Sequence, residues 1–315
     1  MNAKILLSGL MFCAGVVMVS AKDLKVLMVG NSFSICVGKN LPQIVKSVPG
    51  HSLELTSTYI GGCALDRHSK NLKKAEENPS FKPYTVNVWT SGAGRKGRGF
   101  KASVNELLKK NQYDIITIQQ ASRFSWKYET YQPYAGELID YIRKHQPKAE
   151  IVIQQTWAYR CDDPQLKPNL PGEWGIDQTG MYEGIRDSYR KLAEAYHFRV
   201  IPTGDAVQLF RKYTPVKFQP AAKVPDYPEV PSSAGDVVGA SYWRKDAKSG
   251  KQILRIDQGH LNSDGEYLQA CLWFAFLYGE PVGKIAYVPE GMSKETSALL
   301  RKCAQEALDQ YKQVK

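Results

Sequence analysis

The stretch LKVLMVGNSFS at residues 24–34 decides how this chain is expected to fold. Its first part, Leu24–Val29, is mostly apolar and reads as a strand buried on both faces of a sheet. Gly30-Asn31-Ser32 then forms a small polar turn, and an amphipathic helical pattern follows at 41–48. A buried strand that leads through a tight turn into a helix is typical of a parallel α/β sheet.

Further segments repeat this alternation of strand and helix. Short apolar or β-branched strands are expected at 53–58, 114–119, 150–155 and 198–201. Amphipathic helices are expected at 102–110, 135–145, 181–196 and 205–213, a strongly apolar helix at 264–278 and a closing helix at 293–311. The alternation predicts a five-stranded parallel sheet covered by helices on both faces. Ligands bind such sheets at the carboxyl ends of the strands, where Ser32, Gln119, Gln120 and Trp157 fall.

The first 21 residues read as a secretion signal. Lys4 gives a positive start, an apolar run covers 5–19, and Val19-Ser20-Ala21 offers a cleavage site. The run is short for a membrane span, and no later segment resembles one. The sequence therefore predicts a periplasmic or secreted protein without an integral membrane segment after cleavage, and an uncleaved anchor is the alternative.

The remaining 315 − 21 = 294 residues are expected to form a single domain, 22–315. Long loops interrupt it at about 159–180 and 215–256, and the second contains a hairpin at 240–244 and 252–256. Without Lys4 the formal net charge falls from +11 to +10, which favours acidic ligands or serves solubility. Nucleic acid is not an expected partner, because no recognition motif accompanies the charge.

The cysteines give no indication of a metal centre. Six cysteines less Cys13 leave five in the exported part, an odd number that leaves at least one thiol unpaired. Their spacing matches no metal-binding pattern, and neither a metal nor another cofactor is expected.

A second informative stretch lies near the carboxyl terminus. Asp257-Gln258-Gly259-His260 places an acid three residues before a histidine, just ahead of an apolar helix. With Ser32 it provides a hydroxyl, an imidazole and a carboxylate, the groups of a serine hydrolase in the chain order Ser, Asp, His. The alternatives are that Ser32 only caps a helix and that His260 lies by chance in an exposed turn.

Five short motifs extend this observation along the chain. They are GNSFS at 30–34, IGGCALDRH at 60–68, YDIITIQQAS at 113–122, TWAY at 156–159 and DQGHLNSDGEYL at 257–268. With these motifs the chain resembles the SGNH (GDSL-type) hydrolases, especially an uncharacterised branch found in exported bacterial proteins. The resemblance implies a flavodoxin-like three-layer α/β/α sandwich and ester hydrolysis, with Ser32 as nucleophile, His260 as base and Asp257 as its orienting acid.

The resemblance also implies an oxyanion hole. Backbone amides of Ser32 and of Gly61 or Gly62, preferably Gly62, would donate to it. The chain departs from the family at the third motif, where Gly-x-Asn-Asp normally supplies an asparagine side chain. We expect Gln119 or Gln120 to donate in its place, since a glutamine amide offers the same NH₂ group.

Substrate contacts are expected from Asn31, Gly61, His68 and Trp157. His68 has a helix-start position as its alternative role, and Trp157 has core packing. The expected function is an exported serine esterase acting on a small-molecule or glycan ester, with O-acetyl groups of carbohydrates favoured and lipid or thioester hydrolysis left open. The alternative is a glycan- or cell-wall-binding protein of the same fold that lacks catalysis.

Overall fold

The computed structural model describes residues 21–167 and 174–313. Apart from Ala21, the predicted secretion signal therefore lies outside the described residues. Within the described ranges, no helix is both long enough and apolar enough to cross a membrane.

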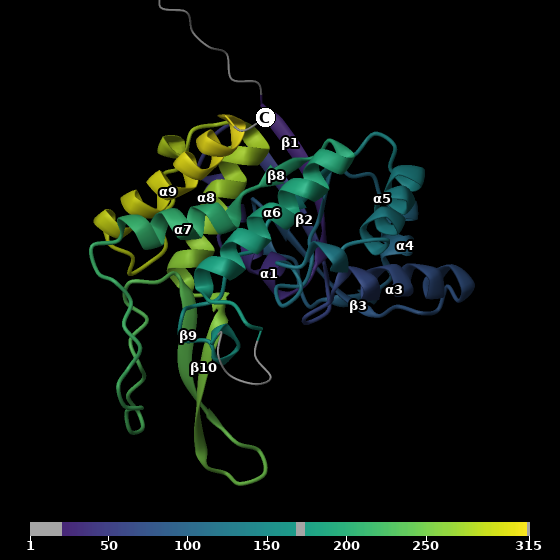
Figure 1. Ribbon diagram of the computed structural model, residues 1–315. Helices are drawn as coiled ribbons and strands as arrows, with labels where there is room; N and C mark the ends of the chain where they lie inside the picture. The colour runs from purple at the N-terminus through teal and green to yellow at the C-terminus, as the bar shows by residue number, and fades with distance from the viewer. Residues whose placement is uncertain (1–20, 168–173, 314–315) are drawn as a thin grey trace, which may run out of the picture.

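A central mixed sheet organises the molecule (Figure 1). Its strands are β1 (Lys22–Gly30), β2 (His51–Tyr59), β3 (Tyr84–Thr90), β4 (Gly94–Arg95), β5 (Phe100–Ala102), β6 (Ile115–Ile118), β7 (Glu150–Gln154) and β8 (Arg199–Ile201). The order is β4-β3-β2-β1-β6-β7-β8, and β5 also pairs with β3. Strands β2, β1, β6, β7 and β8 are parallel to one another, whereas β3 is antiparallel to its three partners.

The predicted five-stranded parallel sheet is thus correct for five strands and wrong for the whole sheet, which has eight. The sequence of β3, YTVNVWT, mixes polar and apolar residues because it lies beside the edge of the sheet, where burial is partial. Strands β4 and β5 have only two and three residues, and their extended form depends on pairing with β3. Such short segments carry no periodicity of their own.

Helices cover both faces of the sheet, because β1 is apolar on both of its faces. Val26 and Met28 share one core with α2 (Leu41–Lys46), α7 (Thr203–Tyr213), α8 (Ser263–Tyr278) and α9 (Lys294–Gln313). Leu27 and Val29 share the opposite core with α3 (Leu65–Glu77), α4 (Val104–Lys110), α5 (Tyr134–His145) and α6 (Gln178–Tyr196). Of these helices, only α3 was not predicted. Side chains that alternate along β1 therefore anchor both helical layers.

A two-stranded hairpin, β9 (Val238–Lys245) and β10 (Gln252–Leu261), projects away from this body (Figure 1). It confirms the predicted hairpin but is longer, so Asp257 and His260 belong to the end of β10 and not to a separate loop. The register of the two strands becomes irregular between Asp257 and Leu261. This irregularity marks the place where the strand leaves the hairpin and approaches the sheet.

Candidate active site

The turn after β1 presents the Ser32 side chain. Asn31 is the N-cap of the short helix α1 (Ser32–Ile35), and its side chain accepts a hydrogen bond of 3.0 Å from the Phe33 amide. The alternative that Ser32 caps this helix is therefore wrong, and its hydroxyl is available for another contact. A Cβ on Gly30 would collide with the Ser34 hydroxyl, so a larger residue at the last position of β1 would have to displace that side chain.

Three side chains far apart in the sequence meet at this turn. The Nε2 atom of His260 lies 2.8 Å from the Ser32 hydroxyl oxygen. The Nδ1 atom of the same ring lies 2.7 Å from Oδ2 of Asp257. The other Asp257 oxygen accepts hydrogen bonds from the backbone amides of Gly259, at 2.9 Å, and His260, at 3.0 Å. The carboxylate thus holds both the ring and the backbone that carries it.

The ionisation of Asp257 determines the tautomer of His260. Burial by itself raises the pKa of Asp257, but hydrogen bonds from the His260 ring and from the backbone amides of His260 and Gly259 outweigh it and lower the pKa to about 2. An ionised carboxylate only accepts hydrogen bonds, so the proton of a neutral His260 ring is on Nδ1. Nε2 then offers its lone pair to the Ser32 hydroxyl.

Two aromatic rings, Phe33 and Trp157, pack beneath His260 on the side of the core. The Phe33 ring meets His260 edge-on, with centroids 5.2 Å apart, and stacks on Trp157 at 4.1 Å. Trp157 is fully buried, and its indole Nε1 donates a hydrogen bond of 2.9 Å to the Gly259 carbonyl. The predicted substrate contact of Trp157 is therefore wrong, because the ring lies beneath the site and has no exposed surface.

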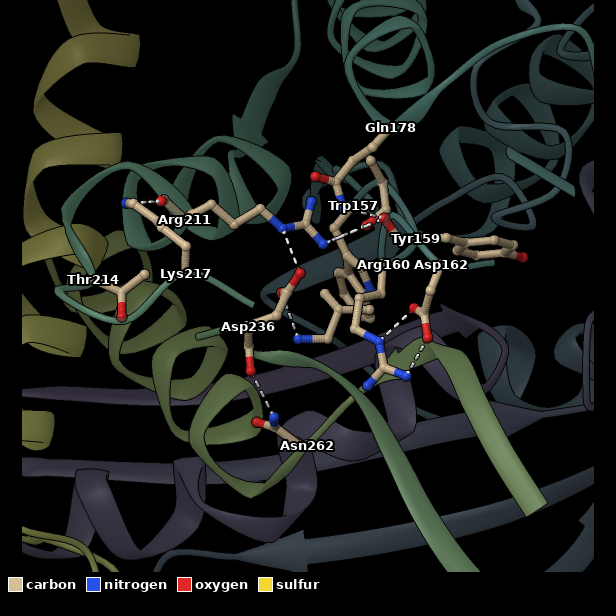
Figure 2. A network of polar contacts seen from close by, with 12 residues as sticks. Trp157, Tyr159, Arg160, Asp162, Gln178, Arg211, Thr214, Lys217, Asp236 and Asn262 are labelled. Carbon is tan, nitrogen blue, oxygen red and sulfur yellow. Dashed lines mark hydrogen bonds and ion pairs between the residues drawn. The ribbon is translucent and has the colours of Figure 1, made fainter. Parts of the chain in front are cut away.

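Figure 2 shows a network of charged and polar side chains that the sequence analysis missed. The Arg211 guanidinium donates to Asp236, at 2.9 Å, and to the carbonyls of Ala158 and Tyr159, at 3.1 and 3.3 Å. Asn262, two residues after His260, donates a hydrogen bond of 2.9 Å to the Asp236 carbonyl. The network therefore joins α7, the segment after β7 and the end of β10. Its partners lie too far apart in the sequence to form a motif.

The backbone amides of Gly62 and Ser32 are the two predicted main-chain donors of an oxyanion hole. Gly62 lies in an exposed turn after β2 with φ +59°, a left-handed conformation that favours glycine. Ser32 begins α1, with its amide at the positive end of that short helix. Within the described residues, neither amide donates a hydrogen bond to another group.

The two glutamines do not take the expected role. The Gln120 NH₂ group donates to the carbonyl and hydroxyl of Thr130, at 3.0 and 3.2 Å, and its oxygen accepts from the amides of Leu65 and Ala121, at 3.0 and 2.8 Å. Gln119 is buried and donates to the Asn31 side chain at 2.8 Å. Both predictions are corrected, because these side chains turn inward to satisfy buried polar groups.

The other predicted substrate contacts divide between surface and core. Gly61 is exposed beside Gly62. Asn31 is buried, and its NH₂ group donates a hydrogen bond of 3.0 Å to the Cys63 carbonyl, which ties the turn after β1 to the turn after β2. His68 is buried in α3 and stacks on Tyr84, with Nδ1 2.9 Å from the Tyr84 hydroxyl. For Asn31 and His68, direct substrate contact is therefore corrected to a structural role.

Metal ligands and disulfides do not contribute to the site within the described ranges. No group of three or more His, Cys, Asp or Glu side chains there is arranged to hold a metal ion. Cys36, Cys63, Cys161, Cys271 and Cys303 are all free thiols.

Comparison with known proteins places the chain in a family. A family model described as a domain of unknown function, DUF4886, matches residues 25–217. The solved structure of a DUF4886 family protein from Bacteroides uniformis is 26% identical, with a TM-score of 0.69, and the match covers 91% of this chain and 95% of that one.

More distant structures also match. A candidate GDSL-like lipase from Parabacteroides merdae is 14% identical with a TM-score of 0.44, over 89% of this chain and 98% of that one. A candidate lipase from Chitinophaga pinensis is 10% identical with a TM-score of 0.32, over 92% and 98%. No curated protein sequence matches. Because the family model covers more than half of the chain, this protein belongs to the DUF4886 family.

Proposed function

We propose that this protein is a serine esterase. The observation that carries the proposal is the pair of contacts that joins Ser32 to His260 at 2.8 Å and His260 to Asp257 at 2.7 Å. A hydroxyl, an imidazole and a carboxylate in this sequence of contacts activate a weak nucleophile by general-base catalysis. The resemblance of the five motifs to SGNH hydrolases supports the same chemistry.

The reaction follows from the roles of the three side chains. Ser32 Oγ attacks the carbonyl carbon of the ester while its proton passes to Nε2 of His260. The imidazolium that forms is stabilised by Asp257 and returns the proton to the departing alcohol. A water molecule, deprotonated by His260, then releases the acid and frees Ser32. The backbone amides of Ser32 and Gly62 stabilise the negative oxygen in both steps.

We further propose that the substrate is an ester on a carbohydrate, with O-acetyl groups favoured, and that the protein acts in the periplasm or outside the cell. The apolar segment at 5–19 with its following small residues supports export. The net positive charge supports ligands that also carry acidic groups, such as uronates.

The test combines covalent labelling with turnover. A fluorophosphonate probe should label Ser32, as mapped by mass spectrometry, and Ser32→Ala should abolish both labelling and hydrolysis across a panel of acetyl, butyryl and longer acyl esters. Ser34→Ala is the matched control, because the Ser34 hydroxyl donates to the Asn31 carbonyl at 3.0 Å and does not contact His260. Turnover that survives Ser32→Ala would contradict the mechanism.

A second candidate function is a binding protein of the same fold without catalysis. The inward orientation of Gln119 and Gln120 favours it, because neither glutamine is placed to stabilise an oxyanion. This function predicts binding to acetylated glycans in a pull-down assay without any reaction with the fluorophosphonate probe. Labelling at Ser32 would exclude it.

A further inference from the structure

A pair of hydroxyl groups lies at the same edge of the sheet as the candidate triad. The Ser122 hydroxyl oxygen is 2.7 Å from the Tyr159 hydroxyl oxygen. Ser122 follows β6, which pairs with β1 directly, and Tyr159 follows β7, the next strand. The pair therefore sits beyond the carboxyl ends of the strands adjoining the one that carries Ser32.

The Tyr159 ring connects this pair to the candidate triad. It packs so closely against Gly259 that a Cβ there would lie 3.2 Å from a ring carbon. Its centroid is 6.5 Å from that of Phe33, the residue after Ser32. The ring thus spans the distance from the segment that holds His260 to the segment that replaces the usual asparagine motif.

The hydrogen bond between the Ser122 and Tyr159 hydroxyls uses the proton of only one of them. Burial raises the pKa of Tyr159, the Ser122 hydroxyl and the Arg123 charge lower it, and the charges of Asp163 and Asp257 raise it, with a net increase. The phenol therefore keeps its proton at neutral pH. A phenol is a stronger acid than an alcohol and is the better donor in such a pair. If Tyr159 donates to Ser122, the hydrogen of Ser122 is free to point elsewhere, and the chain of two hydroxyls strengthens its donor character.

We propose that Ser122 donates the side-chain hydrogen bond of the oxyanion hole, and that Tyr159 is the positioning residue that orients the Ser122 hydroxyl. This inference rests on the proposed esterase function. It explains how the site works although Gln119 and Gln120 are committed to Asn31 and Thr130. In this chain the Ser122 hydroxyl would donate the hydrogen bond that an asparagine side chain donates in the usual family motif.

The proposed role applies to one step of the reaction. As Ser32 Oγ bonds to the carbonyl carbon, its proton goes to His260, and the electron pair of the carbonyl π bond moves onto oxygen. That oxygen receives hydrogen bonds from the amides of Ser32 and Gly62 and from the Ser122 hydroxyl. When the tetrahedral intermediate collapses, the pair returns to the C=O bond, and the alcohol leaves with the proton from His260.

The test is a double-mutant cycle on the full chain with an acetyl ester. Ser122→Ala should lower kcat by about 10²–10³-fold with little change in KM, the usual effect of removing one oxyanion donor. Tyr159→Phe should lower kcat less, because the Ser122 hydroxyl remains but loses its orientation. The double variant should match Ser122→Ala alone, since Tyr159 acts only through Ser122. Tyr128→Phe, which removes a phenol from a neighbouring segment, is the control and should keep wild-type kcat.

A second measurement separates this role from simple structural support. A boronic acid that forms a tetrahedral adduct with Ser32 should lose affinity in Ser122→Ala by the same factor as kcat/KM. Unchanged kcat in Ser122→Ala, or losses that add in the double variant, would overturn the inference while Ser32-dependent hydrolysis by the wild type would leave the proposed function intact. A wild type with neither hydrolysis nor labelling at Ser32 would overturn both.

Discussion

The indole nitrogen of Trp157 donates a hydrogen bond of 2.9 Å to the carbonyl of Gly259, the residue directly before His260. One residue earlier, the Gln258 carbonyl accepts a hydrogen bond of 2.8 Å from the Arg160 amide. The segment after β7 therefore holds two successive carbonyls of the Asp-x-x-His stretch. These two contacts support the backbone that carries His260, and Asp257 holds its ring.

Replacement of Trp157 by Phe should therefore weaken both stability and catalysis. The change keeps an aromatic ring against Phe33 but leaves the Gly259 carbonyl without its donor, which should cost about 1–3 kcal/mol in the free energy of unfolding. A small displacement of His260 should lower kcat by up to about 10²-fold. Urea denaturation and ester turnover measure the two effects. Trp126→Phe is the matched control, because the Trp126 indole nitrogen is buried without a hydrogen-bond partner in the described structure.

Replacement of Asp257 by Asn should lower kcat by about 10⁴-fold, the loss seen when a triad aspartate becomes an amide in serine proteases. An amide can donate to Nδ1 of His260, which would place the ring proton on Nε2 and remove the base from Ser32. Because the pKa of Asp257 is lowered to about 2, its ionised form should persist through the acid limb of the wild-type pH–rate profile. Turnover of Asp257→Asn near wild-type level would contradict the assigned role.

The lowered pKa of Asp257 also predicts how the free energy of unfolding depends on pH. A carboxyl whose folded-state pKa is depressed stabilises the fold above its unfolded pKa, and this contribution is lost as pH falls through the folded pKa. The difference in unfolding free energy between wild type and Asp257→Asn should therefore narrow between about pH 4 and the folded value of about 2. Denaturation at several pH values measures it, and a constant difference would contradict the assigned ionisation.

The candidate triad could be predicted from the sequence because local patterns carry it. An apolar strand, a Gly-Asn-Ser turn and an Asp-x-x-His stretch are each short, and the parallel sheet brings strand ends to one edge. Gln119 and Gln120 show the limit of this reasoning. Their place after β6 was predictable, but the direction of each side chain depends on partners such as Thr130 and Leu65 that only the folded chain brings near.

Two secondary-structure elements and the Arg211 network were not predicted, because local sequence patterns do not reveal them. Helix α3 is amphipathic, but its buried face includes His68 and Ser69 beside Leu65, Leu72 and Ala75, so that face does not read as an apolar stripe. Strand β3 mixes polar and apolar residues and gives an equally weak signal. The contacts of Arg211 with Asp236 and Ala158 join residues 25 and 53 positions apart. No spacing rule relates such residues. Sequence patterns therefore predicted the positions of the candidate triad better than the positions of the side chains that support it.

Gln120→Ala should mainly destabilise the fold. It removes the acceptor of the Leu65 and Ala121 amides and the donor to Thr130, which leaves several buried polar groups unpaired and should cost about 2–4 kcal/mol. By contrast, Ser122→Ala should change stability by less than about 1 kcal/mol while lowering kcat. Thermal unfolding and turnover of the two variants side by side test this contrast. Equal losses of stability would show that the two positions share one structural role.

His68→Gln should reduce the loss of unfolding free energy that occurs as the pH falls. Burial, with a smaller effect of Arg67, lowers the pKa of His68 from 6.5 to about 4, so the folded state keeps the ring neutral. A depressed pKa gives stability that is fully present above about 6.5 and is lost as pH falls toward 4, by about 3 kcal/mol in total. Chemical denaturation between these pH values should show this loss in wild type and a smaller one in the variant. If the unfolding free energies of wild type and variant fell by the same amount over this pH range, His68 would not be the group responsible.

Arg123 should select for acidic esters. Its exposed guanidinium lies 4.7 Å from the centroid of the Phe124 ring and would stand 3.7 Å from a Cβ on Gly62, beside the candidate oxyanion hole. Arg123→Gln should raise KM by about 2–5-fold for esters that carry a carboxylate and leave neutral esters unaffected, because one exposed ion pair is worth about 1 kcal/mol or less. High salt should remove the difference in the wild type. Lys127→Gln, which changes a cation over the Trp126 ring, is the control, and an equal effect of both variants would assign the preference to the general surface charge.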